Sequence, residues 1–130
     1  MTYFHFTCDH GHDGIGGTGT LLPGHFLTKR EVPWTGRLVW LTDLAAPDRD
    51  ALGLTSRILS CDRTRHRYRV TDETEVLPWV QVARTVPHDI REQIEGEPGS
   101  RPMHWYVSPV GVPAVYDPVQ ASFPVERARL

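Results

Sequence analysis

The chain has 130 residues, a formal net charge of −2 and 39% hydrophobic residues. This length allows one domain with its own core but not two, so we predict a single domain over residues 1–130. The near balance of charge gives no chain-wide attraction to nucleic acid or to an anionic membrane. No apolar run approaches membrane-spanning length and no signal peptide is recognisable. We therefore expect a cytoplasmic protein with no membrane partner and no disulfide.

The first predicted element is a strand over residues 2–7, a run rich in aromatic residues. Side chains alternate along a strand, so Tyr3, His5 and Thr7 share one face. A histidine with a hydroxyl-bearing residue on each side is typical of a position that reads a ligand. The alternative is a buried histidine that is bonded to a backbone carbonyl.

A glycine-rich stretch follows, with five glycines between residues 11 and 19, Gly16 and Gly17 among them. Such a stretch lets the backbone approach a ligand and donate N–H groups to phosphates. It is not a P-loop and fits the dinucleotide fingerprint only loosely, so a turn region is the alternative. His10 and His12 lie close to acidic residues here, but no second ligand pair follows at metal-site spacing. No metal site is predicted.

The next strand, expected over residues 37–42, ends in Thr42 and Asp43. This places a hydroxyl and a carboxylate at a strand end, where sites are often built. Trp40 within this strand is either a stacking platform or a core residue. Asp43 is either a site residue or the cap of a turn.

The remaining elements are short, because prolines and glycines interrupt the chain. We expect a poor turn over 11–17, a short helix within 47–59 and a helix over 87–95 that ends at Gly96. Further strands are expected at 65–71, 76–83, 103–108 and 112–117, the last two forming a hairpin. The predicted fold class is α+β, with a compact split or mixed β-sheet and few short helices.

Three motifs in the first third of the chain resemble the small toxin-type ADP-ribosyltransferases of the His-Tyr-Asp subgroup. They are residues 3–7, a Gly-Ile segment leading into Gly19-Thr20-Leu21-Leu22-Pro23, and residues 39–44. The subgroup opens with a Tyr-His-Tyr-Thr-like strand and continues into a Tyr-Leu-Thr-Asp-like strand. A more distant likeness is to the RNA 2′-phosphotransferases.

The resemblance implies an ADP-ribosyltransferase-like fold that uses NAD as its substrate. His5 would then bond a ribose hydroxyl, with Tyr3 and Thr7 beside it. Trp40 stands where the family has tyrosine: it can stack on nicotinamide but lacks the phenol. Asp43 stands where the family has its catalytic acid.

Glu75 is the second choice for the acid, because Glu73-Thr74-Glu75 looks like the Glu-x-Glu element of arginine-directed transferases. The NAD phosphates would meet backbone N–H groups at Gly16 and Gly17, or the side chain of Arg37. Cleavage of the nicotinamide–ribose bond develops positive charge on the ribose, which a carboxylate stabilises.

The function expected from these residues is transfer of ADP-ribose from NAD to an unidentified protein or nucleic-acid acceptor. One alternative is a non-catalytic module on the same fold that binds a nucleotide or nucleic acid. Another is an RNA 2′-phosphotransferase, in which the arginines of residues 63–69 would grip phosphates. A solvated strand is the simpler interpretation of that basic segment.

Overall fold

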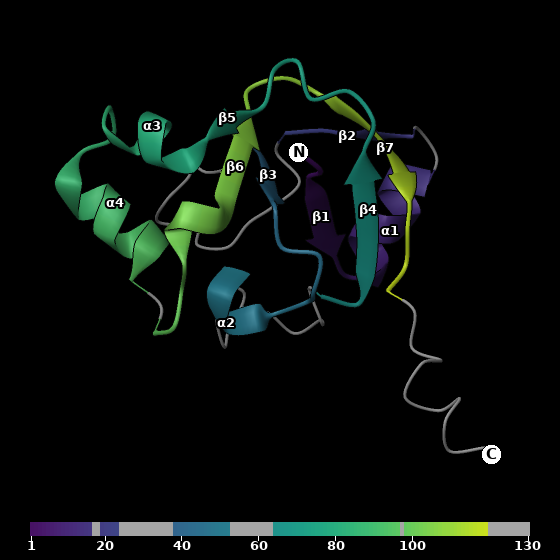
Figure 1. Cartoon of the computed structure of the whole chain (residues 1–130), viewed down its shortest axis with the longest axis horizontal. Coiled ribbons are helices and arrows are strands. Elements are labelled where there is room, and N and C mark those ends of the chain that lie inside the picture. Colours follow the sequence, from purple (N-terminus) through teal and green to yellow (C-terminus); the bar gives the residue numbers. More distant parts are fainter. Residues whose placement is uncertain (17–18, 24–37, 53–63, 97, 120–130) are drawn as a thin grey trace.

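The structure is a computed structural model that describes residues 1–16, 19–23, 38–52, 64–96 and 98–119 (Figure 1). Gly17, Arg37 and the later part of the helix expected within 47–59 lie outside the described residues. Within them, no helix is long and apolar enough to cross a membrane.

A seven-stranded sheet with the order β2-β7-β4-β1-β3-β6-β5 organises the fold. Every described strand pairing is antiparallel. The strands are β1 (Phe4–Thr7), β2 (Thr20–Leu21), β3 (Val39–Thr42), β4 (His66–Val70), β5 (Leu77–Pro78), β6 (Trp105–Ser108) and β7 (Val112–Tyr116). The predicted α+β class is confirmed.

Two apolar clusters form on opposite faces of this sheet, because neighbouring residues of a strand point to opposite faces. Leu41 lies in a cluster with Ile15 and Tyr68. Trp40, the residue before Leu41, packs instead against a cluster that contains Trp79 and Trp105. The two clusters are called here the Leu41 core and the tryptophan core.

The described helices are short: α1 (Asp9–Gly16), α2 (Arg49–Leu52), α3 (Trp79–Ala83), α4 (His88–Glu95) and the 3₁₀ helix η2 (Pro102–His104). Figure 1 shows α3 and α4 beside the β5–β6 end of the sheet, and α1 beside β4 and β7. The helix predicted over 87–95 is confirmed as α4. The turn expected over 11–17 is instead, for residues 11–16, part of an eight-residue helix, α1.

The prediction of a strand over residues 76–83 is wrong. Only Leu77 and Pro78 form a strand, and α3 begins at the next residue. The valines in this segment favour a strand, yet the two buried residues of α3, Trp79 and Ala83, are four apart. That spacing places both on one face of a helix, which packs into the tryptophan core.

The predicted hairpin of residues 103–108 and 112–117 is also wrong, although both strands exist. β6 pairs with β3 and β5, whereas β7 pairs with β4 and β2. Figure 1 shows the chain leaving β6 and crossing one end of the sheet to reach β7 on the far side. Gly111 in this crossing lies close to Thr20 and Leu22, so the segment packs beside β2, a strand that the sequence patterns did not predict.

Candidate functional site

Asp43 lies just after β3, and its carboxylate is held by two side chains from one neighbouring segment. Nδ1 of His104 lies 2.8 Å from Oδ1, and the Tyr106 hydroxyl donates to Oδ2 over 3.2 Å. The backbone N–H of Asp43 also donates to the carbonyl of His104 over 3.3 Å. The Asp43 side chain is 19% exposed. It is therefore a positioned, largely buried carboxylate that still reaches the surface.

Tyr3 completes this group, which is called here the Asp43 cluster: Tyr3, Asp43, His104 and Tyr106. The rings of Tyr3 and Tyr106 lie 4.5 Å apart between centroids. Burial raises the pKa of Tyr106, and the charge of Asp43 and its hydrogen bond add to this. Burial also raises the pKa of Tyr3, with smaller contributions from the charges of Glu73 and Asp43. Both phenols therefore stay protonated at neutral pH and can donate hydrogen bonds.

His5 lies in β1, and its Nδ1 is 2.8 Å from the carbonyl oxygen of Trp40 in β3. A carbonyl only accepts, so Nδ1 of His5 carries the proton in this contact. This contact matches the carbonyl-bonded alternative for His5, although the side chain is only half-buried. By strand alternation His5 shares a sheet face with Tyr3.

Thr7 is buried beneath α1, at 7% exposure, rather than open to a ligand. A Cβ atom added to Gly11 of α1 would collide with the Thr7 hydroxyl, so glycine at this position permits the close approach. Trp40 lies on the opposite face, with its ring 4.9 Å from that of Trp79 and 6.1 Å from that of Trp105. The structure thus separates Thr7 and Trp40 from the Asp43 cluster.

Glu75 is exposed in the turn between β4 and β5, where the Asp72 carboxylate accepts hydrogen bonds from Thr74. Its carboxylate has none of the contacts that fix Asp43. Gly16 is exposed and is the last residue of α1. Gly17 and Arg37 belong to the segments that the structure does not describe.

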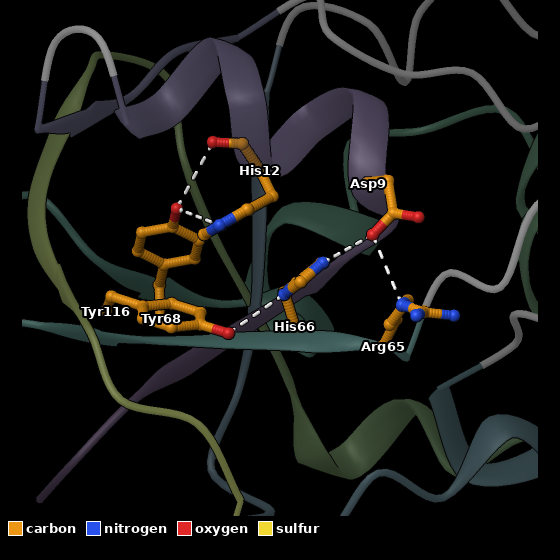
Figure 2. Close-up of polar contacts among 6 residues, drawn as sticks. All are labelled: Asp9, His12, Arg65, His66, Tyr68 and Tyr116. Carbon is orange, nitrogen blue, oxygen red and sulfur yellow. Dashed lines mark hydrogen bonds and ion pairs between the residues drawn. The ribbon is translucent and has the colours of Figure 1, made fainter.

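A second group of polar side chains joins α1, β4 and β7, and is called here the imidazole–phenol cluster: Asp9, His12, Arg65, His66, Tyr68 and Tyr116 (Figure 2). The imidazoles of His12 and His66 stack, 4.0 Å apart and 10° from parallel. His12 Nδ1 lies 2.7 Å from the Tyr68 hydroxyl, and His66 Nδ1 lies 2.9 Å from the Tyr116 hydroxyl. Burial is the main cause that raises the pKa of Tyr68.

The sequence patterns missed this cluster because its members meet only through long-range pairing. His66 and Tyr68 share a face of β4, and the register pairs Tyr68 with Tyr116. The alternation of His66 and Tyr68 was a readable signal. Nothing in the sequence showed that α1 would bring His12 against them.

The three arginines of the basic segment that the structure describes each pair with a carboxylate, two of them with the same one. Arg65 pairs with Asp9 at 3.2 Å, while Arg67 and Arg69 share Asp117 at 3.3 and 3.6 Å. The Arg67 guanidinium also lies over the ring of Phe4. In the part of the chain that the structure describes, no group of three or more histidine, cysteine or acidic side chains is arranged to hold a metal ion.

Comparisons of the chain with family models, with curated proteins and with solved structures found no match.

Proposed function

We propose that this chain is an NAD-dependent, ADP-ribosyltransferase-like protein in which Asp43 is the catalytic acid residue. The observation that carries the proposal is the setting of the Asp43 carboxylate. It is fixed by His104 and Tyr106 and shares a sheet face with Tyr3 and His5. The motif resemblance of residues 1–44 supports the same assignment.

Cleavage of the nicotinamide–ribose bond is favoured by a carboxylate that is fixed and largely buried. When the bond between nicotinamide and ribose breaks, the ribose acquires positive charge, as in glycoside cleavage. A fixed carboxylate stabilises that charge without reorganising, and it stabilises it more strongly when water is largely excluded. Asp43 is one-fifth exposed, and two donors limit its rotation. In this proposal it faces the anomeric carbon of the ribose.

The neighbouring residues have roles in binding. The His5 imidazole, which is oriented by its contact with the Trp40 carbonyl, bonds a ribose hydroxyl. Because the Trp40 ring packs in the tryptophan core, the aromatic surface for nicotinamide is assigned to Tyr3 and Tyr106 instead. This changes the role that the resemblance suggested for Trp40 and leaves the role of Asp43 unaltered.

The test is release of nicotinamide from NAD by the purified full chain, with and without candidate acceptors from protein, DNA and RNA. Turnover that depends on Asp43 supports the proposal. Binding of NAD or ADP-ribose without nicotinamide release supports the non-catalytic module instead. Removal of phosphate from RNA with a 2′-phosphate end would support the phosphotransferase alternative.

A further inference from the structure

We propose that Tyr116 is a nucleophilic phenol, activated by His66 and Asp9, that accepts acyl groups from activated carboxylic esters. The inference concerns residues outside the Asp43 cluster and is independent of the proposed use of NAD. Its basis is a continuous chain of short contacts. Asp9 Oδ1 lies 2.6 Å from His66 Nε2, and His66 Nδ1 lies 2.9 Å from the Tyr116 hydroxyl (Figure 2).

The direction of the hydrogen bonds follows from the partners. The Asp9 carboxylate is paired with the cationic Arg65, whose Nε lies 3.2 Å from the same oxygen. An ionised carboxylate only accepts, so Nε2 of His66 donates to it. The neutral imidazole then has its lone pair on Nδ1, and the Tyr116 hydroxyl donates to that nitrogen. A carboxylate, an imidazole and a hydroxyl in this order are the parts of an activated nucleophile.

The imidazole is held in place more firmly than a surface histidine would be. Its side chain is 14% exposed, and one face of the ring is covered by His12. His12 is itself fixed by its contact with the Tyr68 hydroxyl. Tyr116, by contrast, is 46% exposed. The base is therefore sheltered while the phenol is accessible to a reagent, which is the arrangement that a nucleophile requires.

The step is balanced without a further reactant. The Tyr116 oxygen attacks the carbonyl carbon of the ester as its proton passes to Nδ1 of His66. The ester alkoxide or phenolate leaves, and the products are an acyl ester of Tyr116 and the leaving group. The proton on His66 passes to the leaving group or to water. Asp9 stabilises the imidazolium that forms and acts as a positioning residue.

The experiment uses the intact chain with p-nitrophenyl acetate, and mass spectrometry of peptides measures acetylation at Tyr116. A positioned general base contributes about 10²- to 10⁴-fold. We therefore expect Tyr116 to react at least about tenfold faster than N-acetyltyrosinamide at the same pH. His66→Gln should reduce the rate to that of this model phenol, and Tyr116→Phe should remove the acetyl group from this peptide.

Asp9 supplies a matched pair that does not depend on whether His66→Gln folds. Asp9→Asn should slow acetylation of Tyr116, and Asp9→Glu should restore most of the rate, while melting temperature is recorded for each. A Tyr116 that reacts no faster than the model phenol overturns the proposal. So does a rate that is unchanged in folded His66→Gln or in Asp9→Asn. Because NAD is absent, neither result bears on the proposed function.

Discussion

Asp43 and His104 are joined twice, once through their side chains and once through their backbones. Nδ1 of His104 lies 2.8 Å from the Asp43 carboxylate, and the Asp43 N–H donates to the His104 carbonyl over 3.3 Å. The Thr42 hydroxyl donates to that same carbonyl over 2.9 Å. The end of β3 is thus tied to the start of β6, which fixes the one acid that the proposed function requires.

His5 offers a prediction that separates ligand binding from folding. His5→Ala should weaken NAD binding by about 1–3 kcal/mol through loss of a ligand hydrogen bond. His5→Asn keeps a donor where Nδ1 meets the Trp40 carbonyl but removes Nε2. We expect this variant to melt near the parent temperature yet to bind NAD as weakly as His5→Ala. Calorimetric titration and thermal unfolding measure the two quantities, and equal affinity of His5→Asn and the parent would remove His5 from the ligand site.

Replacing either of two glycines of α1 by alanine should change the stability of the fold, in opposite directions at the two positions. Alanine at Gly11 would meet the buried Thr7 side chain, so Gly11→Ala should destabilise the fold by about 1–3 kcal/mol. A Cβ at Gly14 has no atom within 4 Å, and alanine is a better helix former there. Gly14→Ala should stabilise the fold by about 0.5–1 kcal/mol. Urea unfolding measures both, and a stabilising Gly11→Ala would contradict the close packing of α1 on β1.

Three phenols, one buried and two partly buried, lead us to expect a loss of stability at alkaline pH. The pKa values of Tyr3, Tyr68 and Tyr106 are all raised in the folded chain, burial being the first cause in each case. A raised folded pKa adds stability that is fully present below the unfolded value of 10.0 and is lost as the pH rises through the folded pKa. The free energy of unfolding should therefore fall above about pH 10.

Urea unfolding at several pH values, beside absorbance titration of the phenolates, checks this. Tyr106→Phe is the matched variant, since it removes one shifted phenol and should flatten the alkaline decline. A free energy of unfolding that stays constant while all the tyrosines ionise would contradict the assigned burial.

The ion pairs of Arg67 and Arg69 lead us to expect weak binding to nucleic acid. Arg67 and Arg69 share the Asp117 carboxylate, so one of their two positive charges is offset within the fold. The affinity of the parent for single-stranded RNA should be low and should change little with salt, because few phosphate contacts would release counterions. Asp117→Asn removes the carboxylate that the two guanidinium groups share and should raise both the affinity and its salt dependence. An affinity of the parent that falls steeply with salt would instead favour a strand whose arginines bind phosphates.

The local elements of this fold could be predicted where one period dominates the sequence. The aromatic run of β1 and the spacing of Ile90 and Ile94 in α4 each gave the right element. The prediction of a strand over residues 76–83 failed because branched residues, which favour strands, occupy a helix here. Trp79 anchors that helix. Trp79 is fully buried, and its Nε1 donates to Glu95 of α4 over 2.6 Å. That packing decides the local structure and is not visible in the segment itself.

The sequence indicated individual residues of the candidate site but not which residues lie together in it. Asp43 was recognised from its place after a strand, but its partners His104 and Tyr106 lie about 60 residues later in the chain. Strand order and register bring them together, and neither follows from the period of one strand. The same limit explains why the role of Trp40 stayed open. Its strand was predicted, but the face of the sheet that Trp40 occupies depends on the partner strands.

The central claim is that Asp43 performs the chemistry, and one measurement tests it most directly. It compares nicotinamide release by the parent, Asp43→Asn and Glu75→Gln under saturating NAD. The claim predicts that Asp43→Asn binds NAD nearly as the parent does while turnover falls by about 10²-fold or more, because one electrostatic contact to the transition state is lost. Glu75→Gln, which alters an exposed turn, should turn over like the parent. Parent-like turnover by Asp43→Asn, or loss of turnover in Glu75→Gln alone, would contradict the claim.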